Sequence, residues 1–163
     1  MPITLRDVTA EDEDFLREVY ASSREPEMAM VDWSSEQREA FLRFQFDAQD
    51  SYYRAQFSSA SFQIVLNDGE RVGRLYVLRD GGEIKILDIT VLPRFRSNGI
   101  GSHVIEQILT EAARGGEPVK IWIEQFNPSQ NLFRRLGFSV IAEDGYNQLL
   151  EFRSTAQKLT TAS

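Results

Sequence analysis

The segment PRFRSNGIGSHVI, residues 93–105, joins an apolar, strand-like run to an amphipathic, helix-like run. Gly99 and Gly101 lack the Cβ atoms that would keep a phosphate away from the free N–H groups of a helix N-terminus. Arg94 and Arg96 add positive charge directly before this turn. The segment has two interpretations, a purely structural turn or an anion-binding helix start, and two glycines alone do not separate them.

Two common nucleotide-binding motifs do not fit the segment. The dinucleotide motif requires a third glycine, which is missing here, and a P-loop requires a Gly-Lys-Ser/Thr sequence that does not follow the turn. Three strands that read as antiparallel neighbours also precede the turn, whereas a dinucleotide fold places a parallel βαβ unit there. Both nucleotide-binding classes are therefore excluded.

Length and composition limit the class of protein further. The chain has 163 residues, 42% of them hydrophobic, which predicts one domain over residues 1–153 and a polar tail over residues 154–163. A net charge of −7 argues against nucleic-acid and anionic-membrane partners, and no apolar run reaches the roughly 18–20 residues of a membrane span. The chain has no cysteine and a single histidine, His103, so no metal site is expected. We expect a cytoplasmic domain.

Hydrophobic periodicity and turn residues predict alternating strands and helices. We expect strands over residues 3–7, 62–67, 71–79, 83–91, 119–124, 138–143 and 146–152. We expect helices over residues 11–22, from 34 to about 53, from the glycine turn to 114, and over 129–136, with a loop over 24–33. The sum is an α+β fold of the three-layer sandwich type, in which helices flank a mixed, mostly antiparallel sheet.

Strand 83–91 changes the phase of its apolar residues. Ile84 and Ile86 alternate regularly, but the alternation then continues one residue late, at Leu87, Ile89 and Val91. Such a slip indicates either a β-bulge or a strand that is buried on both faces.

With these residues in view, the chain resembles the GCN5-related N-acetyltransferase (GNAT) superfamily. The superfamily's pyrophosphate motif, Arg/Gln-x-x-Gly-x-Gly/Ala, is matched by residues 96–101, and a second motif is matched by Asn127, Phe133 and Gly137-Phe138. The similarity covers residues 83–152. It implies the GNAT acyl-CoA N-acyltransferase fold, with acetyl-CoA as co-substrate.

The resemblance also implies where acetyl-CoA would lie. The cofactor would enter a V-shaped opening where the strand that ends at Val91 splays from strand 119–124. Its pantetheine arm would pair with the backbone at Ile89 and Val91, near Asn127 and Phe133, and the Val91 N–H would polarise the thioester carbonyl. The pyrophosphate would lie on main-chain N–H groups of the turn, formed by Arg96, Ser97, Asn98, Gly99, Ile100, Gly101 and Ser102. Asn127, followed by a proline, is equally suited to cap a helix.

The catalytic acid and base are less clear from the sequence. Asp88, a carboxylate inside an apolar strand, is either the base that deprotonates the amine or a member of an ion pair. Glu83 and Glu124 are weaker candidates for the base. Many relatives place a tyrosine at position 133 to protonate the departing sulfur, whereas this chain has Phe133. Tyr146 either substitutes for that acid or has a structural role.

The resemblance implies that the acceptor is a primary amine of a small molecule or of an exposed chain, and the sequence does not separate these. The helix from residue 34 carries Phe41, Phe44, Ala48 and Tyr52 on one stripe and Leu42, Phe46 and Tyr53 on a neighbouring stripe. Together with Trp33, these rings either line a pocket for an amine with an apolar part or belong to the core. Two functions remain: transfer of acetyl from acetyl-CoA to the amine by direct attack on the thioester, or a non-catalytic acyl-CoA-binding module. A homodimer is also left open.

Overall fold

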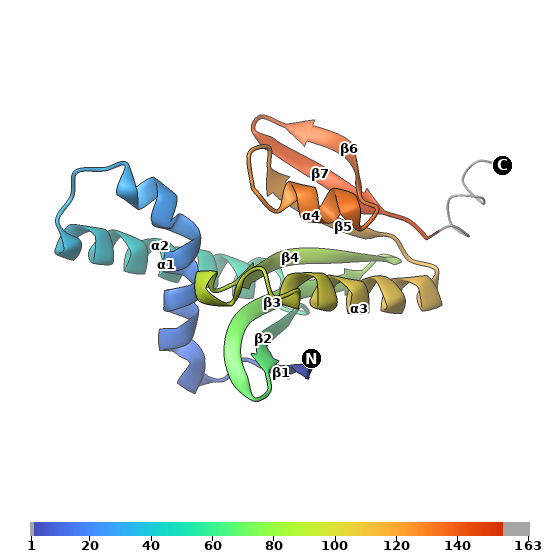
Figure 1. Ribbon diagram of the computed structural model, residues 1–163, viewed down its shortest axis with the longest axis horizontal. Helices are drawn as coiled ribbons and strands as arrows, with labels where there is room; N and C mark the ends of the chain where they lie inside the picture. The colour runs from blue at the N-terminus through green and yellow to red at the C-terminus, as the bar shows by residue number, and fades with distance from the viewer. Residues whose placement is uncertain (1, 155–163) are drawn as a thin grey trace.

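The computed structural model describes residues 2–154, which form a seven-stranded sheet in the order β1-β2-β3-β4-β5-β7-β6 (Figure 1). The strands are β1 Ile3–Asp7, β2 Ser61–Asn67, β3 Glu70–Asp80, β4 Glu83–Val91, β5 Val119–Glu124, β6 Ser139–Asp144 and β7 Asn147–Phe152. Neighbouring strands are antiparallel except for β4 and β5, which are parallel. The predicted mixed, mostly antiparallel sheet is confirmed. Residues 155–163 of the predicted tail lie outside the described residues.

Helices cover both faces of the sheet. α1 (Glu13–Ala29) and α2 (Ser35–Gln56) lie on one face, and α3 (Ile100–Gly115) and α4 (Gln130–Arg135) lie on the other (Figure 1). Short 3-10 turns, Ala10–Asp12 and Pro93–Phe95, precede α1 and α3. The α1–α2 side buries Phe15, Leu16, Val19, Tyr20, Phe46 and Ile64, and the α3–α4 side buries Ile84, Ile86, Ile100, Val104, Ile105, Ile108, Ile121 and Phe133. The sheet with these two cores forms the predicted three layers.

The phase change in strand β4 is a β-bulge. Tyr76 of β3 is paired with Asp88, and the next residue, Val77, is paired with Ile86, so that Leu87 is the extra residue on β4. A bulge shifts the side-chain alternation by one position, which explains why Ile86 and Ile89 both pack into the α3-side core. Of the two interpretations of the sequence, the bulge is confirmed.

The first helix is longer than the sequence predicts. α1 continues to Ala29, so the prediction of a loop over residues 24–33 is wrong for its first half. Pro26 cannot donate a helical hydrogen bond, yet Met28 beyond it is buried, and Arg24 pairs with Glu27 at 2.9 Å across it. Burial of Met28 offsets the local cost of the proline, as tertiary packing often does.

α2 begins with the predicted capping box. Ser34 Oγ accepts from the Gln37 N–H at 3.1 Å, and Gln37 Oε1 accepts from the Ser34 N–H at 2.8 Å. The two apolar stripes of α2 differ in their exposure to solvent. Leu42, Phe46 and Tyr53 face the rest of the molecule, while Phe41, Phe44, Ala48 and Tyr52 are exposed. We call this exposed set the aromatic stripe.

Two further properties concern the part of the chain that the structure describes. Across residues 2–154, no helix combines the length and apolar character that crossing a membrane requires. In the same residues, no three His, Asp or Glu side chains gather closely enough to hold a metal ion.

Candidate functional site: an opening between two parallel strands

The parallel ladder between β4 and β5 is short. It pairs Ile84 with Val119, Lys85 with Lys120 and Ile86 with Ile121. Beyond Ile86, β4 continues to Val91 and stays paired with β3, while β5 continues beside β7. The two strands therefore diverge towards their carboxyl ends, which is the V-shaped opening that the resemblance implies.

The backbone of β4 turns hydrogen-bonding groups into this opening. Leu92 donates its N–H to Val72 O of β3 at 2.9 Å. Because N–H directions alternate along an extended strand, the N–H groups of Val91 and Ile89 point the other way, towards the side that β5 has left. The Val91 carbonyl points to that side too, and it accepts from Arg96 Nε at 3.0 Å. The opening thus contains an outward N–H beside a carbonyl already held by the glycine turn.

The glycine turn ends in a helix N-terminus with unused donors. The helical ladder of α3 starts with the His103 N–H bonded to Gly99 O at 3.0 Å, so the N–H groups of Ile100, Gly101 and Ser102 have no helical partner. Gly99 has φ of +77°, a left-handed conformation that disfavours other residues. The turn that precedes α3, residues 96–99, is exposed. Three donors without a helical partner and the positive helix end therefore lie together, directly after the exposed turn.

No contact within the protein requires a glycine at position 101. A Cβ built there would meet only Leu132 Cδ2 at 3.7 Å, an ordinary contact, and its φ is not left-handed. Neither packing nor backbone strain requires a glycine at this position. A glycine here does leave the free N–H groups open to close approach of a ligand, so the residues present fit a pyrophosphate.

Asp88 lies in an ion pair beneath α2. Its Oδ2 accepts from Arg74 Nη2 at 2.6 Å and its Oδ1 accepts from the Thr90 hydroxyl at 2.7 Å. The Arg74 side chain is only 2% exposed, while Asp88 keeps 15%. Arg74 also donates to Gln49 of α2 at 3.0 Å. Of the two roles left open by the sequence, the ion pair is present, and it does not by itself exclude a second role as a base.

Sequence reasoning missed Arg74, and a usable signal was present. Arg74 is a charged residue within a run of buried strand residues, from Val72 to Val77. A charge in that position needs a partner, and Asp88 is the acid on the neighbouring strand. Finding the pair requires the register, in which Tyr76 lies opposite Asp88 and Arg74 lies opposite Thr90.

Tyr53 connects α2 to the bulge of β4. Its hydroxyl donates to the carbonyl of the bulge residue Leu87 at 3.3 Å, and its ring packs edge-on against Tyr76. Burial, together with the nearby charge of Asp88, raises the pKa of Tyr53 to about 12. The phenol is therefore a neutral hydrogen-bond donor at any physiological pH.

Phe133 is enclosed in the core. The ring is 1% exposed and packs edge-to-face on Phe138, with 5.1 Å between ring centroids. The expectation that it packs against the pantetheine arm has no exposed ring surface to support it in this structure. The edge of a tyrosine at this position would point among the same apolar side chains.

The other predicted polar residues are distributed around the opening. Tyr146, 77% exposed, lies in the β6–β7 turn, and its carbonyl accepts from the Gln125 N–H just beyond the end of β5. Asn127 does not cap α4 directly, because that helix begins at Gln130; its Oδ1 instead accepts from the Ser129 N–H at 2.8 Å. Glu124 ends β5 beside the opening, whereas Glu83 begins β4 at the far end and pairs with a lysine at 2.7 Å.

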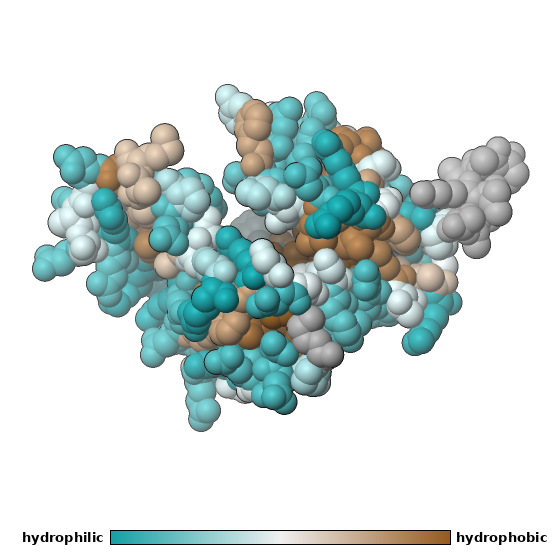
Figure 2. Space-filling view, viewed as in Figure 1, coloured by the Kyte–Doolittle hydropathy of each residue, from teal (hydrophilic) through white to brown (hydrophobic). Residues whose placement is uncertain are grey.

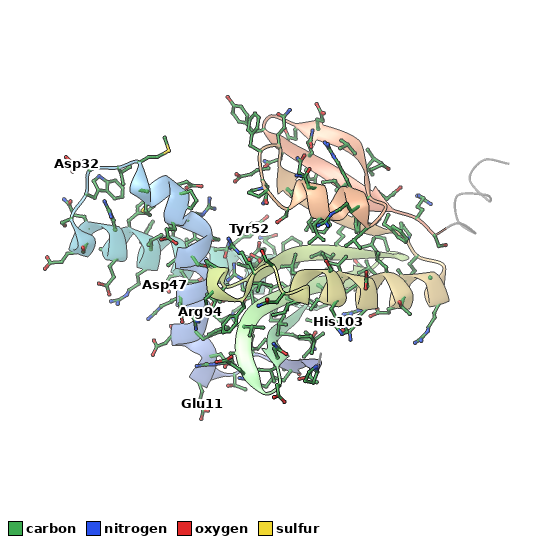
Figure 3. The ribbon with its side chains drawn as sticks, in the orientation of Figure 1. Glu11, Asp32, Asp47, Tyr52, Arg94 and His103 are labelled. Atoms are coloured by element: carbon green, nitrogen blue, oxygen red, sulfur yellow. The ribbon has the colours of Figure 1, made fainter. Side chains whose placement is uncertain are left out.

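The surface is hollowed between the arm formed by α1 and α2 and the lobe formed by β5, β6, β7 and α4 (Figure 2). Tyr52 lies on α2 below the lobe, and Asp32 lies at the tip of the arm (Figure 3). A separate cavity of about 390 Å³ lies on the opposite side of α2, against the start of α1, and is lined by residues that include Glu13, Phe46 and Asp50. The opening between β4 and β5 is the candidate site, because the outward N–H of Val91 and the start of α3 lie beside it.

Comparison with known proteins agrees with the fold. Three solved structures are similar to the chain at 17–21% identity, a level that shows the fold alone. PaiA N-acetyltransferase of Thermoplasma acidophilum, in complex with coenzyme A, has a TM-score of 0.71 and 19% identity, with 94% of this chain and 100% of that chain covered. A GCN5-related N-acetyltransferase of Rhodopseudomonas palustris has a TM-score of 0.63 and 21% identity, with 94% and 97% covered. A GNAT family acetyltransferase of Elizabethkingia anophelis, with acetyl-CoA bound, has a TM-score of 0.56 and 17% identity, with 93% and 98% covered.

No curated protein sequence matches the chain. The model of the acetyltransferase (GNAT) family matches residues 23–138, which is more than half of the chain. This protein therefore belongs to the acetyltransferase (GNAT) family, whose members transfer acyl groups from acetyl-CoA.

Proposed function

We propose that this protein transfers the acetyl group of acetyl-CoA to the primary amine of an acceptor, by direct attack of the amine on the thioester. One observation carries the proposal. The outward N–H of Val91 and the free N-terminus of α3 lie at the two ends of one short connection, residues 92–99. Acetyl-CoA, with a thioester at one end and a pyrophosphate further along, needs two donor sites arranged in this way.

The chain would hold this co-substrate mainly with its backbone. The N–H groups of Ile100, Gly101 and Ser102 would bind the pyrophosphate, and the turn formed by Arg96, Ser97, Asn98 and Gly99 would surround it. Ile89 and Val91 would pair with the pantetheine arm in the place that β5 has left, as an added strand does. Acetyl-CoA supplies an activated carbonyl, and the Val91 N–H would stabilise the negative charge that develops on its oxygen.

The amine must lose a proton to react, because an exposed primary amine is protonated at neutral pH. We propose Asp88 as the group that receives this proton, directly or through water. Its carboxylate is partly exposed, lies three residues before Val91, and is held in one orientation by Arg74 and Thr90. As the amine nitrogen bonds to the carbonyl carbon, the carbon–sulfur bond breaks, and the sulfur takes a proton from Tyr146 or from water.

The alternative, a non-catalytic acyl-CoA-binding module, was suggested by the missing hydroxyl at position 133. The burial of Phe133 weakens that suggestion, because a side chain enclosed in the core is not placed to protonate the sulfur, whether it is phenylalanine or tyrosine. The thiol of CoA is in any case an acceptable leaving group, since a thiol's reference pKa is near 8.5. We therefore favour the enzyme.

A thiol-release assay tests the proposal. The protein is incubated with acetyl-CoA and a panel of primary amines, and free CoA is measured with and without each amine. We expect amine-dependent release and a product that carries one acetyl group by mass spectrometry. Binding of acetyl-CoA without release on any amine would favour the binding module, and absence of binding would reject both functions.

A further inference from the structure

We propose that the aromatic stripe of α2 binds the body of the acceptor, and that the acceptor is a primary monoamine with an uncharged, apolar body. The inference rests on the proposed N-acetyltransferase activity and names its substrate class. It starts from exposed rings: Phe44 is 70% exposed and Tyr52 is 57% exposed. Contiguous exposed apolar residues of this size commonly mark a binding surface.

The distribution of charged residues on α2 indicates what kind of acceptor body the aromatic stripe can bind. Six charged residues recur at helical spacing along one side of α2, namely Glu36, Glu39, Arg43, Asp47, Asp50 and Arg54. The aromatic stripe itself carries no charge, and neither do Gln37, Gln45, Ser51 and Ala55 beside it. The seventh charged residue of α2, Arg38, borders the stripe at Phe41 and donates a hydrogen bond to the Val31 carbonyl at 3.3 Å. A helix side that only faces water would mix charges among its residues. Over about three turns, from Phe41 to Tyr52, the aromatic stripe contains no charged residue, which suits an uncharged ligand and opposes a polycation.

The contacts of α2 show where the aromatic stripe points. The charged side faces α1, where Asp47 lies 3.6 Å from a guanidinium, and β2, where Arg54 stacks on a ring. The inner side reaches β3 through Gln49 and β4 through Tyr53. The sheet continues from β4 to β5, so the remaining side of α2 is turned past β4 towards the opening and the hollow beside it. Tyr52 lies at this hollow (Figure 3).

The opposite wall of the hollow also presents a ring. Ile121 and Ile123 of β5 are buried on the α3 side of the sheet. Because side chains alternate along a strand, Trp122 projects from the other face, which is the face that α2 covers over β4, and it is 51% exposed. An amine placed at Val91 would therefore extend its body between Trp122 and the aromatic stripe.

The length of the stripe gives the expected dependence on substrate size. Phe41 and Tyr52 are 11 residues apart, which is roughly 17 Å along a helix. Each methylene that leaves water for an apolar surface raises the apparent specificity constant by up to about fourfold. The gain should level off once the body outgrows the aromatic stripe.

The first experiment measures kcat/KM for n-alkylamines from ethylamine to decylamine at saturating acetyl-CoA. We expect a rise with chain length, then a plateau. Octylamine and 1,8-diaminooctane form a matched pair, and we expect the monoamine to be preferred. A preferred diamine would overturn the proposal, because it would show that the rings hold a cation by their faces instead of an apolar chain. Equal rates for all chain lengths would overturn it as well.

The second experiment uses Phe44→Gln, with Asp47→Asn as the control on the charged side of the same helix. Because Phe44 is mostly exposed, the substitution should leave the melting temperature unchanged. We expect kcat/KM for octylamine to fall roughly tenfold while that for ethylamine stays constant, and we expect Asp47→Asn to change neither. An equal loss for both amines, or no loss, would overturn the proposal.

Two further measurements separate this proposal from its alternatives. If sedimentation shows a dimer that Phe44→Gln dissociates, the stripe serves a second copy of the chain and the proposal is overturned. If no amine is acetylated although acetyl-CoA binds, the proposed function fails instead. Octylamine binding to the CoA-bound protein, measured by calorimetry, then decides: binding that Phe44→Gln weakens supports the stripe, and no binding overturns it.

Discussion

Replacing Asp88 by asparagine tests whether the Arg74–Asp88 pair is structural, catalytic or both. The substitution leaves the guanidinium of Arg74, 2% exposed, without its counter-charge. Removing one partner of a buried pair costs about 3–5 kcal/mol. We expect the lower end, about 3 kcal/mol, because the amide carbonyl of the variant can still accept a hydrogen bond from Arg74. In a chain of this size that is a melting temperature lower by roughly 6–12 °C.

The rate must be measured on the same preparation, at a temperature where the variant is fully folded. If Asp88 is also the base, turnover per folded molecule falls by about 10²–10⁴, while the affinity for acetyl-CoA stays the same. Thr90→Val is the matched control, since it removes the hydroxyl bonded to Asp88 Oδ1 and keeps the carboxylate. A melting temperature within about 2 °C of the original, which corresponds to less than about 1 kcal/mol, would refute the reasoning about the buried pair.

Three further predictions follow from single positions. Acetyl-CoA at one hundred times its Kd should stabilise the protein by about 2.7 kcal/mol, which raises the melting temperature by roughly 5–11 °C. Gly101→Val should abolish this rise and leave the melting temperature without ligand nearly unchanged, because a side chain there meets only Leu132. An undiminished rise in the variant would place the pyrophosphate elsewhere. Phe133→Tyr should lower stability by about 1–3 kcal/mol without raising the rate, since its hydroxyl would be buried among apolar groups; faster thiol release at an unchanged melting temperature would contradict the buried position. Asp12, 1% exposed and bonded to Arg6 at 2.8 Å, has a pKa held well below its usual range by that guanidinium. The folding free energy that ionised Asp12 contributes is fully present above about pH 4 and is lost as the pH falls below that value. The melting temperature of Asp12→Asn should therefore fall less steeply with decreasing pH than that of the original protein. Parallel plots of melting temperature against pH would contradict this dependence on Asp12.

The strands that bound the opening could be predicted from the sequence because their signals are local. The bounds of β4 and β5 match the predicted ranges, and the bulge at Leu87 is visible as a slip in the apolar alternation. The glycine turn is local as well, since Gly99 and Gly101 are read from consecutive residues. Patterns of this kind need no knowledge of what lies across the sheet.

The remaining features depend on contacts between distant segments. Whether Asp88 is free or paired depends on the register against β3, which the bulge sets. Whether α1 ends before Pro26 depends on the burial of Met28, which no local rule contains. Whether the ring of Phe133 faces a cofactor or the core depends on how α4 packs against Phe138. For Asp88 and Phe133 the sequence identified the residue but not the direction of its side chain, and for α1 it predicted the wrong end of the helix, because tertiary packing decides all three.

The short parallel ladder also bears on how the molecule opens and closes locally. In the described chain, three residue pairs connect β4 to β5, so few backbone hydrogen bonds join the half of the sheet with β1–β4 to the half with β5–β7. A unit joined in this way can separate at a lower free energy than global unfolding requires. The pantetheine arm of acetyl-CoA, if it bonds to β4 while it lies against β5, would connect the two halves of the sheet. Its binding should therefore slow hydrogen exchange in β6 and β7, at amides that it never touches.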